Sequence, residues 1–142
     1  MAIFLTADTH FNHANIIKYC NRPFNSANHM NEIMFSAWQE TVGKKDEVYH
    51  LGDVAHGGGD IDAVINRIKM LPGTKFLVPG NHDKKLLDKF GVAFQILQPL
   101  VEATFQCQSG NQKVILCHYP LMAWNGAFRG AINLYGHVHG CI

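Results

Sequence analysis

Five short apolar runs divide the chain, and each leads into polar residues of the kinds that bind metal ions. The runs are rich in β-branched, aromatic and aliphatic side chains, which is typical of buried β-strands. They cover residues 2–7, 47–51, 75–79, 114–117 and 132–135. Asp, Asn or His follows each run, directly or within a few residues. Because ligands of open α/β sheets gather at the carboxyl ends of the strands, we expect these polar residues to converge on one patch.

Helical periodicity appears between the first and the second of these runs. Residues 14–19 favour a short helix that ends at the proline-containing turn 21–24. Apolar side chains then recur every three or four positions over residues 28–42, with Ser26 or Asn28 as the expected N-cap. These segments separate the first strand from the second.

Two further helical patterns follow in the middle of the chain. One begins after Asp60 and ends at the breaker pair Pro72-Gly73, and its apolar positions form the stripe of an amphipathic helix. The other is shorter, covers Lys84–Phe90 and is closed by Gly91. The alternation of strands and helices predicts parallel βαβ units for this half of the chain.

The second half of the chain lacks such helical segments. Residues 94–97 and 100–105 predict two shorter strands with no helix between them. A turn at Ser109–Asn111 joins the second of these strands to residues 113–117 as a hairpin. The expected fold class is therefore α/β, with a parallel first half and a partly antiparallel second half.

Composition narrows the domain organisation and the compartment. A chain of 142 residues with 47% hydrophobic residues suits one globular domain, which we expect to cover residues 1–142. Its four cysteines form no CxxC pair, which argues against a thiolate zinc site or a dense disulfide framework and favours the cytoplasm. No apolar run approaches the roughly 20 residues that span a bilayer, so we expect no membrane partner.

Charge and histidine content point to a small substrate. The formal net charge of +1 provides no overall field for a polyanion, so extended nucleic acid is a disfavoured partner. Nine histidines among 142 residues is a high count. Histidine is the commonest metal ligand and the usual acid or base near neutral pH.

The residues at the strand ends form a ligand set for two divalent metal ions. Their oxygen and nitrogen donors suit manganese, iron, zinc or nickel better than calcium. Seven ligands are too many for one tetrahedral ion but match two ions that share a carboxylate. Such ions, roughly 3.5 to 4 Å apart, can hold a bridging hydroxide and clamp the oxygens of a phosphate ester. The seven residues are Asp8, His10, Asp53, Asn81, His118, His137 and His139.

Taken in order, these residues resemble the five-motif signature of the calcineurin-like metallophosphoesterases. The match covers nearly the whole chain, and the motifs are more specific together than singly. The matching segments are Asp8-Thr9-His10, Gly52-Asp53, Gly80-Asn81-His82-Asp83, His118 and Gly136-His137-Val138-His139.

The resemblance implies a double-sheet αββα sandwich with the two metal ions between the sheet ends. It also implies how the ligands divide: Asp8, His10, Asp53 and His139 for one ion, and Asp53, Asn81, His118 and His137 for the other. His82 is then not a ligand, but contacts the phosphate or the leaving oxygen.

Two departures from the family pattern narrow the expectation. The protein-phosphatase branch continues its second motif as GDxxDRG, whereas Gly52–Gly57 contains no arginine, so a serine/threonine protein phosphatase is disfavoured. The chain ends three residues after His139, so we expect a compact or C-terminally truncated form of the fold. An exposed sheet edge at Ile132–Tyr135 could be covered by a partner, and a homo-oligomer is one such expectation.

Catalytic and substrate-binding candidates come from the same segments. His82 and Asp53 are the candidate catalytic residues, and Asn81 and His82 the first candidates for substrate contact. His13 and Arg22 are two more, because an arginine fork matches two phosphate oxygens. The alternative is that His13 caps a helix and that Arg22 lies on the surface.

The sequence thus predicts metal-dependent hydrolysis of a small phosphomonoester or phosphodiester by a hydroxide that bridges two ions. The alternatives are a non-catalytic, metal-binding interaction module of the same fold and a nuclease. Two other histidines have different expectations: His50, inside a strand, should be a core residue with satisfied hydrogen bonds, and the role of His56 is open.

Overall fold

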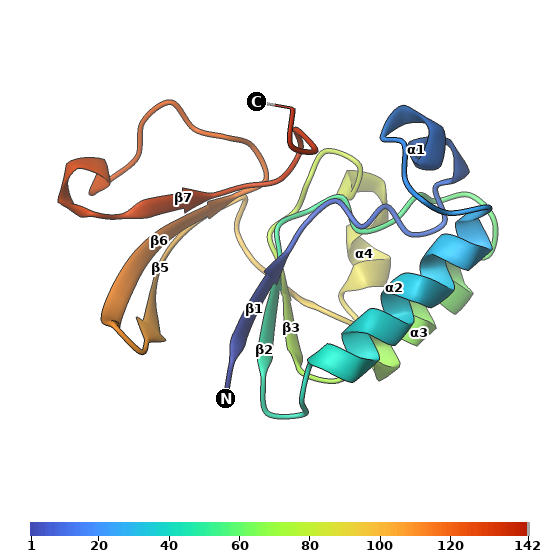
Figure 1. Cartoon of the computed structure of the whole chain (residues 1–142), viewed down its shortest axis with the longest axis horizontal. Helices are drawn as coiled ribbons and strands as arrows, with labels where there is room; N and C mark the ends of the chain where they lie inside the picture. The colour runs from blue at the N-terminus through green and yellow to red at the C-terminus, as the bar shows by residue number, and fades with distance from the viewer. Residues whose placement is uncertain (142) are drawn as a thin grey trace.

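The computed structural model describes residues 1–141 and contains two β-sheets packed side by side (Figure 1). All strands of the first sheet are parallel, in the order β1 (Ile3–Thr6), β2 (Glu47–His50), β3 (Thr74–Leu77) and β4 (Gln95–Ile96). The second sheet has the order β5 (Leu100–Cys107), β6 (Gly110–Cys117) and β7 (Ile132–Leu134). There β5 and β6 are antiparallel, whereas β6 and β7 are parallel. The structure confirms the expected change from a parallel to a partly antiparallel half.

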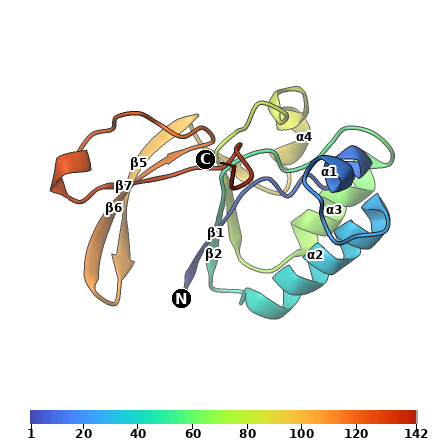
Figure 2. The ribbon, with the colours of Figure 1, turned by 45° about the horizontal axis from the view of Figure 1, so that its top comes forward.

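The α-helices lie on the side of the first sheet that faces away from the second sheet (Figures 1 and 2). They are α1 (Ala14–Tyr19), α2 (Ala27–Thr41), α3 (Ile61–Met70) and α4 (Leu87–Phe90), and the 3₁₀ turns are η1 (Lys84–Leu86) and η2 (Ala127–Arg129). Within residues 1–141 no α-helix covers the outer face of the second sheet, so these residues form three of the four layers of an αββα sandwich. No helix in this part of the chain combines the length and the apolar character that a membrane span requires.

Side-chain caps explain where the two long helices begin. The Ser26 hydroxyl accepts a hydrogen bond from the backbone N–H of His29, so Ser26 rather than Asn28 is the N-cap of α2. The Asp60 carboxylate likewise accepts from the backbone N–H of Ala63 and caps α3. Both helices then bury their apolar stripe against the first sheet.

The hairpin between β5 and β6 is longer than predicted. Strand pairing continues to Cys107 and Gly110, so the turn consists of two residues and lies one position earlier than expected. Gly110 has a φ of 113°, which permits this tight reversal. The sequence prediction placed Gly110 in the turn itself, because a glycine usually indicates the end of a strand.

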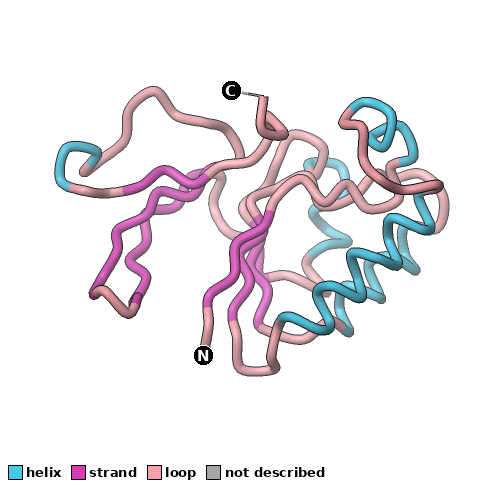
Figure 3. Tube along the Cα trace, in the orientation of Figure 1, coloured by secondary structure: helices cyan, strands magenta, loops and turns pink. Residues whose placement is uncertain are grey.

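Two apolar clusters hold these layers in place. The larger one lies between the first sheet and the helices, and the smaller one lies between the two sheets. Tyr49 of β2 connects the sheets, because its ring stacks on Phe76 with 4.7 Å between centroids and lies 5.0 Å from Phe105 of β5. Each fully buried aliphatic or aromatic side chain contributes about 1.5 to 3 kcal/mol. The sheets are thereby held so that the loops after β1, β2, β3, β6 and β7 gather at one edge of the molecule (Figure 3).

His50, at the end of β2, is a core histidine with both ring nitrogens paired, as predicted. Its Nδ1 accepts from the backbone N–H of Gly52 at 3.1 Å, and its Nε2 lies 2.9 Å from the Thr9 hydroxyl. That hydroxyl donates to the carbonyl of Val54, so it accepts from Nε2–H. A proton added at Nδ1 would face the N–H of Gly52. Complete burial lowers the pKa of His50 to about 3.

We expect the metal-free protein to lose stability as the pH falls from 6.5 to about 3. In this window the unfolded chain protonates His50 and the folded chain does not, so the residue contributes a slope of up to about 1.4 kcal/mol per pH unit. Urea unfolding at a series of pH values measures the slope. A His50→Gln variant should be less stable at pH 7 but show a shallower decline, and an unchanged slope would exclude His50 as its source.

Candidate metal centre

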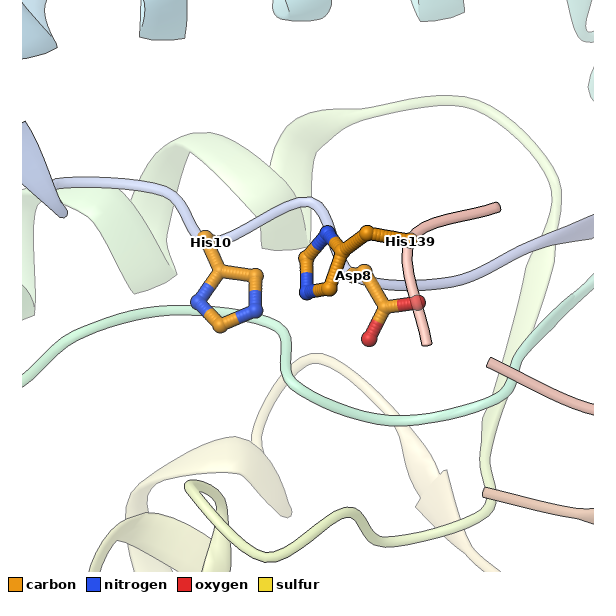
Figure 4. Close-up of side chains that lie close together, drawn as sticks. All are labelled: Asp8, His10 and His139. Atoms are coloured by element: carbon orange, nitrogen blue, oxygen red, sulfur yellow. The ribbon is translucent and has the colours of Figure 1, made fainter. Parts of the chain in front are cut away.

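Two groups of three potential ligands lie next to each other where the carboxyl ends of the two sheets meet. Within each group the ligand atoms all lie within 4.8 Å of one another. Asp8, His10 and His139 form the first group, from the segments after β1 and β7 (Figure 4). Asp53, His118 and His137 form the second, from the segments after β2, β6 and β7. The structure therefore brings together six of the seven residues that the sequence singled out as ligands.

Asn81, the seventh residue, adjoins the second group. Its Oδ1 lies 3.1 Å from Nε2 of His118. Asp53 lies between the groups, because its Oδ2 is 3.3 Å from Nε2 of His118 and 3.6 Å from Nε2 of His10. The other oxygen, Oδ1, accepts a hydrogen bond from the backbone N–H of His82. One carboxylate oxygen thus faces histidines of both groups, which is the position that a carboxylate shared by two ions requires.

The surroundings of His10 and His118 direct one ring nitrogen of each toward the site of the metal ions. Nε2 of His10 is buried and has no hydrogen-bond partner among residues 1–141, which is costly unless a ligand completes it. Burial lowers the pKa of His10 to about 3, so its ring is neutral and its Nε2 can offer a lone pair. Nδ1 of His118 donates to the carbonyl of Leu51 at 2.7 Å, which directs Nε2 of His118 toward Asp53 and Asn81. These residues fit a pair of divalent ions.

Asp53 and His118 stabilise each other's charged forms in the metal-free protein. Burial alone would raise the pKa of Asp53, but hydrogen bonds from His118 and the backbone N–H of His82 outweigh it and lower the pKa to about 2. Burial would lower the pKa of His118, but its hydrogen bonds to Asp53 and to the Leu51 carbonyl raise it. A metal ion at this position therefore competes with the proton on His118.

The backbone of the site is held in an uncommon conformation. Five of the six grouped residues have positive φ angles: 54° at Asp8, 50° at His10, 57° at Asp53, 72° at His137 and 49° at His139. This left-handed region is unfavourable for residues with a side chain, by about 1 kcal/mol or more each. Surrounding contacts must therefore impose these angles.

Two glycines permit the close approach of the loops. A Cβ atom on Gly80 would lie 2.7 Å from the backbone nitrogen of Asp53, and one on Gly136 would lie 2.7 Å from Oδ2 of Asp8. Because Gly136 has no side chain, the carboxylate of Asp8 can accept from the backbone N–H of His137, at 2.9 Å to Oδ2. This bond joins the segment after β1 to the segment after β7.

Asp83 contributes to the site in a way that the sequence did not show, although it belongs to the matching segment Gly80–Asp83. Its side chain is fully buried, and its Oδ2 accepts from the backbone N–H groups of Asp53 and Gly80 at 2.8 and 2.7 Å. Its Oδ1 accepts from the N–H of Val54 at 2.9 Å. Burial raises the pKa of Asp83, and these three donors act in the opposite direction. Asp83 follows the ligand Asn81 by two residues, but only the fold shows that it points inward.

Arg22 contacts the backbone beside the ligands. The sequence made it a candidate for substrate contact, with a surface position as the alternative. In the structure its Nη1 donates to the carbonyl of Thr9 at 2.8 Å and its Nη2 to the carbonyl of Asp8 at 2.6 Å. The fork that would match two phosphate oxygens thus binds two carbonyls of the segment that carries Asp8 and His10. This geometry favours a positioning role over substrate contact.

His13 lies among other histidines at the edge of the site. Its Nδ1 is 3.1 Å from Nδ1 of His10, and its ring stacks on His56 with 4.6 Å between centroids. The ring of His82 lies 5.4 Å from that of His10. His82 is exposed, whereas His10 is buried. The structure therefore brings His82 and His13 beside the first ligand group.

Comparison with known proteins agrees with this arrangement. Residues 1–134 match the family model described as calcineurin-like phosphoesterase. The chain therefore belongs to this family, whose activity is the metal-dependent hydrolysis of phosphate esters. The two ligand groups at the carboxyl ends of two sheets are the part of the fold that such an activity would use.

The names of similar proteins assign no activity to them. Uncharacterized protein MJ1445 of Methanocaldococcus jannaschii is 36% identical over 137 residues, which cover 96% of this chain and 69% of that protein. The Gene 66 protein of Mycobacterium phage D29 is 29% identical, over 99% of this chain and 79% of that protein. The crystal structure of the protein of unknown function AQ665 from Aquifex aeolicus superposes with a TM-score of 0.69 at 26% identity, covering 91% of this chain and 67% of that one.

Replacing Asp83 should weaken both folding and metal binding. An Asp83→Asn side chain has one acceptor oxygen, so at least one buried N–H among its three donors loses its partner, at a cost of about 1 to 3 kcal/mol. Urea unfolding and the stoichiometry of bound metal measure the two effects. Asp88→Asn, at an exposed acid of α4, is the matched control and should change stability by less than about 0.5 kcal/mol. Equal behaviour of the two variants would contradict the role of Asp83.

Arg22→Lys should weaken metal binding roughly tenfold, with little change in KM. Lysine cannot hold two carbonyls with one planar fork, so the Asp8 segment loses part of its support. Titration with a metal-sensitive dye and steady-state kinetics separate the two effects. Arg67→Lys is the control, because Arg67 also makes a two-pronged contact, but with Glu32 on the surface. An increase in KM at unchanged metal affinity would contradict the positioning role and indicate that Arg22 contacts the substrate.

Proposed function

We propose that this chain hydrolyses small phosphate esters with two divalent metal ions, each held by four side chains that include the shared Asp53. The observation that carries the proposal is the position of Asp53 Oδ2, 3.6 Å from His10 and 3.3 Å from His118. Asp8, His10, Asp53 and His139 would hold one ion, and Asp53, Asn81, His118 and His137 the other. Manganese, iron, zinc and nickel all suit this donor set.

When bound, such ions supply Lewis acidity toward phosphoryl oxygens and acidify a water molecule. Stabilisation of the leaving oxygen is the role of His82, which is exposed beside the first ligand group. Its backbone N–H is tied to Oδ1 of Asp53, so the residue is anchored to the shared carboxylate. From this position the imidazole can donate a hydrogen bond or a proton to the leaving oxygen, a contribution of roughly 10² to 10⁴ in rate.

Two alternative functions predict different results in assays of metal binding and hydrolysis. A non-catalytic interaction module would bind two ions and hydrolyse nothing, and a nuclease would prefer polymers to small esters. None of the seven ligand positions is missing, and the net charge of +1 provides no general attraction for a polymer. We also propose a cytoplasmic location, which the four cysteines support because all are free of disulfides.

The direct test is a panel of phosphomonoesters, phosphodiesters and cyclic nucleotides with each metal added separately. Asp53→Ala should lose both ions and all activity, because it removes a ligand from each. His82→Ala should keep two ions and lose roughly 10² to 10⁴ in kcat, with the larger loss for leaving groups of high pKa. Metal content is measured by elemental analysis of the same samples.

His29→Gln is a suitable control, since His29 lies at the start of α2 and its ring nitrogen Nδ1 accepts only from the nearby backbone N–H of Asn25. It should retain both metal content and turnover. Two ions retained in Asp53→Ala would contradict the shared carboxylate, and loss of metal from His82→Ala would make His82 a ligand. A wild-type protein with two bound ions and no turnover on any ester would favour the interaction module.

A further inference from the structure

A cavity of about 560 Å³ opens next to the candidate metal centre. Its volume lies within the range of small-molecule sites in proteins. One wall is the loop after β2, which includes His56, and the other is the segment from Asn81 to Leu86. Asn81 and His82 are thus shared between the cavity and the metal centre. The other residues that line the cavity have no role in the proposed metal binding or in the chemistry at the ions.

Two adjacent lysines, Lys84 and Lys85, line this cavity. Both are exposed, and neither forms an ion pair or a side-chain hydrogen bond within residues 1–141. By contrast, Lys89 in the next helical turn pairs with Asp62 at 2.7 Å. The neighbouring acid, Asp83, is buried and its carboxylate is taken up by backbone N–H groups. The cavity therefore carries positive charge that no side chain lining it neutralises.

Two lining residues connect the cavity to the metal centre. These are Asn81 and His82, and both lysines of η1 line the same cavity. The exposed His56 stacks on His13 and forms the opposite wall, and Leu86 adds apolar surface. His82, which adjoins the shared carboxylate of Asp53, therefore also lines this cavity.

We propose that the cavity holds the leaving group of the substrate and that Lys84 and Lys85 bind a second phosphate on that leaving group. The inference rests on the proposed function and narrows its substrate class to small esters with two phosphates. Hydrolysis transfers the reacting phosphoryl group to water, breaks its bond to the ester oxygen and returns a proton to that oxygen. The product in the cavity is therefore an alcohol that still carries one phosphate.

A matched pair of substrates tests this assignment. Adenosine 3′,5′-bisphosphate and adenosine 3′-phosphate share the reacting 3′ group, and only the first has a second phosphate. The metal-loaded protein should release the 3′ phosphate from the bisphosphate with a kcat/KM roughly tenfold higher, and the advantage should shrink as salt is added. The double variant Lys84→Ala/Lys85→Ala should lose this preference and keep its kcat/KM for the monophosphate.

The chain offers a matched control in a second lysine pair. Lys44 and Lys45 are also exposed, but they lie in the turn before β2, at the opposite end of the sheet. Lys44→Ala/Lys45→Ala removes the same charge and should leave the preference unchanged. A loss in both double variants, or no preference in the wild type, would overturn the assignment.

Binding separates this inference from the proposed function. Calorimetry on the metal-loaded protein should show that Lys84→Ala/Lys85→Ala weakens adenosine 5′-phosphate roughly tenfold and leaves inorganic phosphate unchanged. Lysine-dependent binding without turnover on any ester would overturn the proposed function alone. Turnover with binding that ignores the lysines would overturn the inference alone, and faster cleavage of single-stranded oligonucleotides than of the bisphosphate would overturn the small-substrate class.

Discussion

The buried carboxylate of Asp83 is the contact on which the candidate metal centre depends. It binds the backbone N–H groups of Asp53, Val54 and Gly80, and so joins the loops after β2 and β3. Asp53 is held in this way with a φ of 57°, an angle that its own preference does not favour. The carboxylate that would serve two ions is thus placed by another carboxylate that would touch neither.

Other ligands are likewise held in place by groups that are not ligands themselves. Arg22 donates to the carbonyls of Asp8 and Thr9, and the Leu51 carbonyl orients His118. The Asp8 carboxylate accepts from the N–H of His137, which connects positions 129 residues apart in the chain. Because ligands come from both sheets, metal binding and the packing of the sheets stabilise the same arrangement.

The surroundings of the ligands divide the site into two electrostatic parts. At the centre, Asp8 and Asp53 provide negative charge for cations. Beside it, Lys84 and Lys85 provide positive charge with no acidic partner lining the cavity. A substrate with one phosphate at the centre and another in the cavity would complement both parts once ions are bound. In our proposal this local arrangement of charge, rather than the overall charge of +1, selects among phosphate esters.

The sequence alone determined the alternation of strands and helices and the set of polar residues at the strand ends, because both follow from local periodicity and turn chemistry. It located α1 and the cap at Asp60, and it indicated the family through ordered motifs. It did not reveal the inward direction of Asp83, the carbonyl contacts of Arg22 or the extended β5–β6 pairing. Each of these depends on which distant backbone groups come within hydrogen-bond reach, and the packing of the two sheets and helices decides that.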